Sequence, residues 1–217
     1  MSADLRKRLA SGEWATGDVL PTTRELAEVG ASHSRRLERG SCGEVACNVT
    51  GMAGAAGMAD WRDVELGAPE IARLGTARLS AARVAMLGTL RQDGSPRISP
   101  IEPYIVNGRL LVGAMRWSAK AADLRRDPRY ALNSIVTGPD SGEGELKLHG
   151  IAAEADSGLR GDAAEAWWSA QPPDNAIVYV LLIGQALFVA WDIERGGMAV
   201  HRWSARDGYS YTTRTYP

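Results

Sequence analysis

Ser118 and Lys120 lie where an apolar segment of the chain ends and a polar, helix-forming segment begins. Pro128 disfavours helical geometry at the residue before it, so we expect a helix from about Ala119 to Arg126 with Ser118 as its N-cap. The first turn of a helix offers unpaired backbone N–H groups and a partial positive charge, which favour an anion. A lysine there opposes the helix dipole unless something negative binds. The pair therefore indicates a phosphate site, with an ordinary helix cap as the alternative.

The elements around this junction are mostly strands. Asp93-Gly94 and Asn107-Gly108 lie between apolar runs, and such dipeptides are the strongest short-range hairpin signals because they tolerate positive φ. They predict a three-stranded antiparallel meander before the helix. The long run from Ala176 to Trp191 is interpreted as two buried strands broken at Gly184-Gln185. Expected strands are residues 84–90, 96–106, 109–115, 130–136, 145–155, 186–193 and 198–203, with further helices at 69–82 and 161–171. This pattern favours a small antiparallel barrel over a βαβ fold.

Composition limits the classes of partner. The chain has 217 residues and a formal net charge of −1, so it has no global attraction to nucleic acid or to anionic membranes. Cys42 and Cys47 are the only cysteines, and with no second pair nearby they predict neither a disulfide framework nor a metal site. No signal-peptide pattern or bilayer-length apolar run is visible, so we expect a cytoplasmic protein with no membrane partner.

The chain divides near residue 60. Residues 41–60 are rich in Gly and Ala, which is typical of a linker. Before them, Leu5 to Ser32 resembles the start of a GntR-type winged helix-turn-helix, but its recognition helix and wing are missing. We therefore expect residues 1–40 to be a degenerate helix-turn-helix-like fragment without sequence-specific binding to nucleic acid. A ligand-sensing transcriptional regulator remains an alternative function.

Residues from Arg83 to Leu132 carry a second resemblance. The Thr89 strand followed by Asp93-Gly94, the Ile98 to Ile101 strand and the spaced Ser118 to Arg129 element are similar to the pyridoxamine 5′-phosphate oxidase-like family. The resemblance implies that residues 61–217 form a six-stranded antiparallel split β-barrel of the FMN-binding type, an α+β fold that is mainly β.

The same resemblance implies a function. Family members are homodimers that hold a flavin in a cleft between subunits, so we expect FMN, or alternatively the deazaflavin coenzyme F-420, and an oxidoreductase acting on a small molecule. A non-catalytic flavin carrier is the alternative. The cofactor-binding residues implied are Ser99, Pro100, Ile101, Met115, Ser118, Ala119 and Lys120.

The chain also differs from the true vitamin B6 oxidases, which have arginine and lysine where it has Ser99 and Tyr104, and arginine where it has Ala119. Oxidation of pyridoxamine phosphate is therefore not expected. No set of Ser, His and Asp suggests catalysis, and the catalytic residues stay unknown. His201-Arg202 are candidates for substrate contact, and Trp167-Trp168 for core or dimer-interface anchors.

Overall fold

The computed structural model describes residues 57–136, 142, 144–166, 175–192 and 194–215. The helix-turn-helix-like fragment, most of the linker and Trp167-Trp168 lie outside these residues, so the predictions for them stay predictions. None of the helices in the described ranges is long and apolar enough to cross a membrane.

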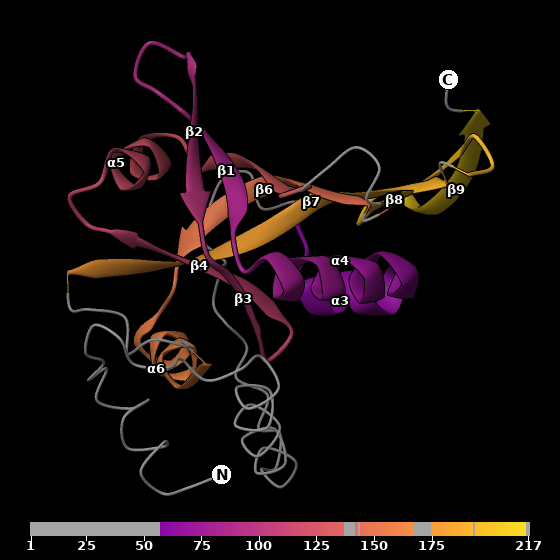
Figure 1. Cartoon of the computed structure of the whole chain (residues 1–217). Helices are drawn as coiled ribbons and strands as arrows, with labels where there is room; N and C mark the ends of the chain where they lie inside the picture. Colours follow the sequence, from indigo (N-terminus) through magenta and orange to yellow (C-terminus); the bar gives the residue numbers. More distant parts are fainter. Residues whose placement is uncertain (1–56, 137–141, 143, 167–174, 193, 216–217) are drawn as a thin grey trace, which may run out of the picture. The chain divides into compact units, whose positions relative to one another are not determined.

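Four helices and nine antiparallel strands form in the described part of the chain (Figure 1). The helices are α3 (Trp61–Gly67), α4 (Pro69–Ala82), α5 (Ala119–Arg126) and α6 (Ser157–Ala166). The strands are β1 (Ala85–Leu90), β2 (Pro96–Ile101), β3 (Pro103–Val106), β4 (Arg109–Met115), β5 (Arg129–Ser134), β6 (Glu145–Glu154), β7 (Ala176–Asp192), β8 (Gly197–Ser204) and β9 (Gly208–Thr215).

The sheet curls because its two end strands are neighbours in sequence. Strand order is β2-β1-β5-β6-β7-β4-β3, so β2 and β3 lie at opposite ends. Glu102 alone separates them. The two ends of the sheet must therefore approach each other at this residue, although no hydrogen-bonded ladder joins them.

Two prolines lie close to the break between β2 and β3. Pro100 and Pro103 lack an N–H donor, and proline is tolerated in sheets at edges and strand starts. The expected single strand from 96 to 106 is therefore wrong. Its first half pairs with β1 and its second half with β4, so the expected three-stranded meander is two separate hairpins.

β7 is one strand of 17 residues, which corrects the expectation of two. Gly184 is the extra residue of a β-bulge, because His149 pairs with Gln185 while Gly150 pairs with Ile183. Before the bulge β7 pairs with β4, and after it with β8. The glycine thus marks a change of neighbour within a continuous strand.

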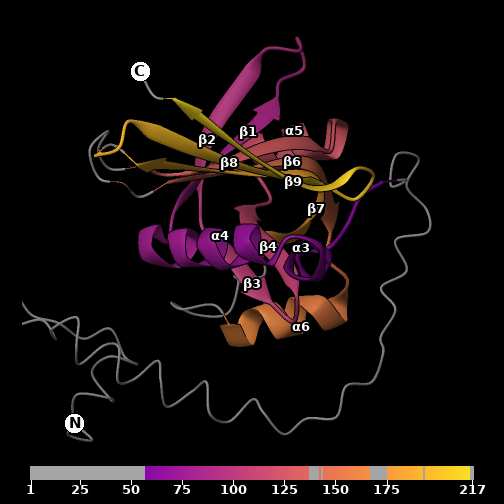
Figure 2. The same cartoon turned by 90° about the vertical axis from the view of Figure 1, so that its right-hand side faces the viewer.

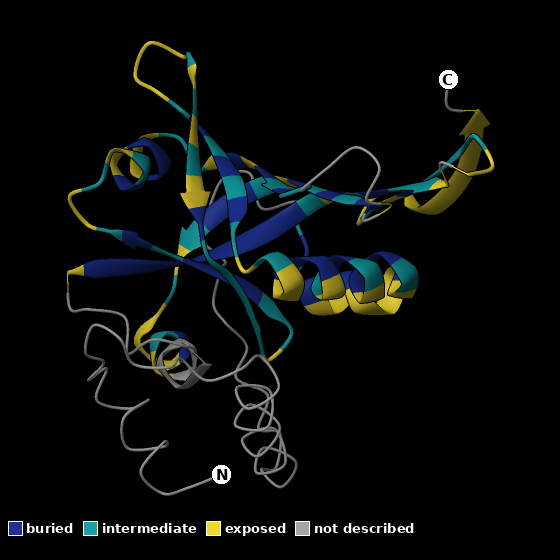
Figure 3. Cartoon of the chain, viewed as in Figure 1, coloured by how far each residue is buried: buried dark blue, intermediate teal, exposed yellow. Residues whose placement is uncertain are grey.

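Both faces of β7 are buried, which accounts for its uninterrupted apolar sequence. Ile177, Tyr179, Leu181 and Ile183 belong to a core shared with α3, α4 and α5. Val178, Val180 and Leu182 belong to a second core that also contains Leu159 of α6. α5 lies above β3 and β4, and α6 lies below them, in both views (Figures 1 and 2). Figure 3 shows β7 buried along much of its length and β9 exposed throughout.

The expected mainly antiparallel β fold with short helices is confirmed, with nine strands where six were expected. The polar β9 was not anticipated, because its sequence GYSYTTRT has no apolar alternation. The helix Pro69–Ala82 has the expected bounds, whereas α6 begins at Ser157, four residues before the prediction. α3 was missed, although Asp60 and Asp63 form a capping pair in which the Asp60 N–H donates to Asp63 Oδ2 at 2.8 Å.

The bulge generates the first testable prediction. A Cβ on Gly150 would lie 1.8 Å from the Leu182 carbonyl oxygen, so one of the two strands would have to move. Gly150→Ala should therefore lower the free energy of unfolding by about 3 kcal/mol, measured by urea denaturation. In the control Gly161→Ala, on α6, the new Cβ meets no atom within 4 Å and should stabilise the chain by about 0.5–1 kcal/mol. If Gly150→Ala were as stable as the wild type, the close approach of Gly150 to the Leu182 carbonyl oxygen would be contradicted.

Candidate functional site

α5 begins at the junction that the sequence singled out. Ser118 is its N-cap, with its Oγ accepting a hydrogen bond from the Ala121 N–H at 3.4 Å. The Ser118 N–H in turn donates to the Met115 carbonyl oxygen at 2.8 Å, so the end of β4 fixes the start of the helix. The helix ends at Arg126, two residues before Pro128, as expected.

Lys120 connects this helix to the end of β2. Its Nζ donates to the Pro100 carbonyl oxygen at 2.8 Å. Burial lowers the pKa of Lys120, while the nearby charge of Glu102 acts in the opposite direction. The ammonium is therefore partly desolvated, which is the environment in which an additional anionic partner gains most.

The structure brings the predicted cofactor-binding residues together from three elements. Ser99 and Met115 are half-buried, and Ala119 is exposed on the first turn of α5. The Ile101 side chain belongs to the main core, so it is not available to a ligand at the surface. The residues joined through the Lys120 and Ser118 hydrogen bonds are Pro100, Met115, Ser118 and Lys120.

A buried carboxylate, Asp123, is the feature that sequence reasoning missed. Its Oδ2 accepts hydrogen bonds from Thr89 Oγ1 at 2.9 Å and from Arg97 Nε at 2.6 Å, and its Oδ1 lies 3.1 Å from Arg126 Nη2. Burial raises the pKa of Asp123, but the hydrogen bonds from Arg97, Thr89 and Arg126 outweigh it and lower the pKa overall. Asp123 thus ties α5 to β1 and β2. The spacing of Asp123 and Arg126 on one helix face was the available signal.

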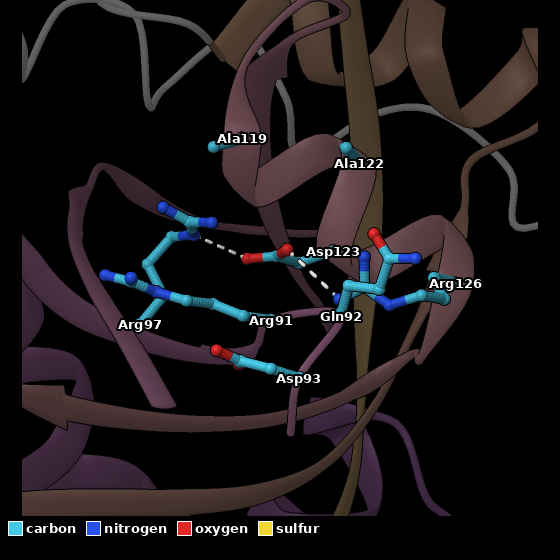
Figure 4. Close-up of a pocket in the computed structure, with 8 residues that line it drawn as sticks. All are labelled: Arg91, Gln92, Asp93, Arg97, Ala119, Ala122, Asp123 and Arg126. Carbon is cyan, nitrogen blue, oxygen red and sulfur yellow. Dashed lines mark hydrogen bonds and ion pairs between the residues drawn. The ribbon is translucent and has the colours of Figure 1, made fainter. Parts of the chain in front are cut away.

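An open hollow of about 480 Å³ lies beside this ion pair (Figure 4). We call it the arginine hollow. Only Ala119 is shared between its lining and the predicted site. The lining residues are Arg91, Gln92, Asp93, Arg97, Ala119, Ala122, Asp123 and Arg126.

A second hollow of about 390 Å³ lies between the end of α4 and β3. Tyr104 and Ile105 form one wall, and Arg83 lies at the helix end. Arg83 has φ 58° and caps the helix through its N–H on the Leu79 carbonyl oxygen at 2.8 Å. The backbone there adopts the left-handed conformation that glycine usually supplies.

His201 and Arg202, the candidates for substrate contact, lie on β8 rather than beside α5. His201 is buried, and its Nδ1 lies 2.8 Å from Tyr209 Oη on β9. The Tyr211 ring packs against the same imidazole, with ring centroids 4.9 Å apart. Arg202 is exposed. Within the described residues, His201 is therefore occupied in holding the β8–β9 hairpin together.

Comparison with known proteins gives a likeness of fold. No family model and no curated protein matches the sequence. A pyridoxamine 5′-phosphate oxidase-related, FMN-binding protein from Nostoc punctiforme is 14% identical with a TM-score of 0.50, covering 69% of this chain and 96% of that one. PhzG from Burkholderia lata, solved with tetrahydrophenazine-1-carboxylic acid, is 16% identical with a TM-score of 0.50, covering 70% and 92%. A heme-binding protein from Mycobacterium smegmatis is 15% identical with a TM-score of 0.47, covering 66% and 88%.

At these identities the likeness shows the fold and nothing finer. The described chain has the fold of the pyridoxamine 5′-phosphate oxidase-like FMN-binding proteins. The expected fold class is thereby confirmed. This likeness does not identify a ligand or a reaction for this chain.

The Asp123 ion pair generates the second prediction. Asp123→Ala leaves two guanidinium groups without their carboxylate, so the free energy of unfolding near pH 7 should fall by about 3 kcal/mol. The folded-state pKa of Asp123 lies below its unfolded value. Its contribution is therefore complete above the unfolded pKa and is lost as pH falls through the folded pKa. Urea denaturation at a series of pH values should show wild type and variant converging in acid.

Glu65→Ala is the matched control, because Glu65 is an exposed carboxylate on α3. It should change stability by no more than about 0.5 kcal/mol at any pH. A gap between wild type and Asp123→Ala that stays constant into acid would argue that the loss comes from packing and not from charge.

Proposed function

We propose that the chain binds a phosphorylated flavin at the start of α5 and is an oxidoreductase acting on a small molecule. FMN is the first candidate, and the deazaflavin coenzyme F-420 is the alternative. The observation that carries the proposal is the partly buried ammonium of Lys120 beside the first turn of α5. The fold, which the FMN-binding protein from Nostoc punctiforme shares, supports it.

The groups present fit a phosphate. An ammonium has three N–H donors, and Lys120 uses one of them on Pro100, so two are left for an anion. The backbone N–H groups of Ala119 and Lys120 lie in the first turn, where a helix provides no carbonyl acceptor. Ser118 is used as the cap. In this proposal Lys120 holds the phosphate and the helix N–H groups complete its ligands.

A bound flavin would supply the electron transfer, and the chain would bind and orient it. The half-buried Ser99 hydroxyl and the exposed Pro100 ring would lie beside the ring system. A catalytic side chain is not part of the proposal, since flavin chemistry does not require an acid–base set on the protein. A non-catalytic flavin carrier with the same site is the alternative.

We also propose a homodimer that closes the site. Ile98 on β2 and Trp117 just before α5 are 69% and 78% exposed, which is unusual for large apolar side chains. Both belong to the segments that carry the candidate site. A second copy of the chain covering them would exclude water from a flavin bound at Lys120.

The third prediction tests the phosphate contact. Lys120→Ala should weaken FMN binding by roughly ten- to a hundredfold, because a charge-assisted hydrogen bond contributes about 1.5–3 kcal/mol. Riboflavin, which lacks the phosphate, should bind weakly and be almost indifferent to the substitution. Fluorescence titration at matched salt measures both affinities, and the absorbance spectrum of the purified protein identifies any flavin, deazaflavin or heme that it carries.

Arg125→Ala is the control, because it removes the same charge from an exposed position at the other end of α5. It should leave FMN affinity unchanged within about twofold. If Lys120→Ala and wild type bind FMN equally, Lys120 serves only to tie α5 to β2 and the proposed site is wrong.

The fourth prediction concerns the dimer. Wild-type protein at micromolar concentration should scatter light as a dimer, and the double variant Ile98→Glu/Trp117→Glu as a monomer, because buried carboxylates without partners oppose association. Leu66→Glu, on α3 and also 78% exposed, should stay dimeric. A wild-type monomer that still binds FMN would exclude an intersubunit site.

A further inference from the structure

The arginine hollow is formed by two segments that are distant in sequence. The β1–β2 turn supplies Arg91, Gln92 and Asp93, β2 supplies Arg97, and one face of α5 supplies the rest. Alanines at positions 119 and 122 keep the helix side of the hollow open. Its volume of about 480 Å³ lies within the range of small-molecule sites.

Two of the three guanidinium groups are held in place by the protein. Arg97 binds Asp123 through Nε, so its two terminal nitrogens remain available. Arg126 uses Nη2 on both Asp123 and the Leu90 carbonyl oxygen, which leaves Nη1. Figure 4 shows Arg97 and Arg126 on either side of the carboxylate that positions them. An anion entering the hollow would not have to immobilise these side chains, so it would bind at a smaller entropic cost.

The third guanidinium, that of Arg91, has no partner in the part of the chain that the structure describes. Within the described residues Arg91 makes no side-chain hydrogen bond or ion pair, although its charge helps to lower the pKa of Asp93, after the hydrogen bonds from Ser95. Asp93 accepts from the Ser95 N–H and Oγ at 2.9 and 2.6 Å. Both carboxylates of the hollow, Asp93 and Asp123, therefore already accept hydrogen bonds. The hollow contains three arginines and only these two carboxylates, so positive charge is in excess.

We propose that the arginine hollow binds the phosphate group of a small phosphorylated compound. Guanidinium N–H donors suit phosphate because they present parallel hydrogen bonds to its oxygens. A phosphate also carries more charge than a carboxylate, which suits a site with three cations. Nucleic acid fits less well, since the net charge of −1 provides no wider positive surface around this single hollow.

The hollow and the flavin site proposed at Lys120 have only Ala119 in common. Arg97 and Pro100 are three residues apart on β2, which corresponds to roughly 10 Å along the strand. Lys120 reaches Pro100, whereas Ala119, Ala122 and Asp123 line the hollow from the adjoining face of the helix. The inference therefore does not depend on flavin binding.

Inorganic pyrophosphate is the probe, titrated calorimetrically into the full chain at about 0.15 M salt. Arg91→Ala should raise the pyrophosphate Kd about tenfold, a loss of about 1.4 kcal/mol. The Arg91 side chain is exposed and makes no hydrogen bond or ion pair within the described residues, and its backbone bonds to Ser95 and Gly94 stay in the variant, so the fold should be unaffected. Arg125→Ala, with the same charge change elsewhere on α5, should alter the Kd less than twofold. No binding by wild type, or equal weakening by both variants, would overturn the proposal.

A second titration uses protein saturated with FMN and decides whether the two sites are distinct. The pyrophosphate Kd should be the same with and without FMN, and Arg91→Ala should leave FMN affinity unchanged. Loss of pyrophosphate binding in the presence of FMN would show that the hollow is part of the flavin site and would overturn the separate site. Protein that binds pyrophosphate but neither FMN nor coenzyme F-420 would refute the proposed function and leave this inference standing.

Discussion

The constraint on which the rest of the structure depends is the single residue between β2 and β3. These strands occupy opposite ends of the sheet, yet Glu102 alone joins them. A flat sheet cannot satisfy that connection, so the seven strands of the path curl until their ends meet. The curl encloses the main core, and no hydrogen-bonded ladder joins β2 to β3 at the two ends.

α5 packs against this curl through both apolar and polar contacts. Ala121 and Leu124 enter the core, while Lys120 and Asp123 bind the end and the beginning of β2. The polar contacts have different electrostatic characters. Asp123 is paired with two guanidinium groups, whereas Lys120 donates its hydrogen bond to a neutral carbonyl and has the charge of Glu102 nearby. This difference is why we propose the anion site at Lys120 and assign Asp123 the role of positioning Arg97 and Arg126.

Local signals in the sequence predicted local structure well. The bounds of α5, its Ser118 cap and the turns at Asp93-Gly94 and Asn107-Gly108 follow from backbone preferences of a few residues, and the structure has all of them. The division of residues 96–106 into two strands depends on which distant strand each half meets, so periodicity could not predict it. The continuity of β7 across Gly184 likewise depends on a bulge opposite Gly150. Asp123 looked like an ordinary polar helix residue because its partners Thr89 and Arg97 lie on other elements.

The contrast between β7 and β9 has a consequence for how fast their backbone amide protons exchange with solvent. β7 has neighbours on both sides and core on both faces, so its amide protons should exchange with solvent only when the whole domain unfolds. β9 pairs with β8 alone, and all eight of its residues are exposed. Its outer amides face water already, and its inner ones need only the hairpin to separate. One sheet is therefore expected to contain both slowly and rapidly exchanging strands, and the contacts of His201 with Tyr209 and Tyr211 oppose the opening of the β8–β9 hairpin.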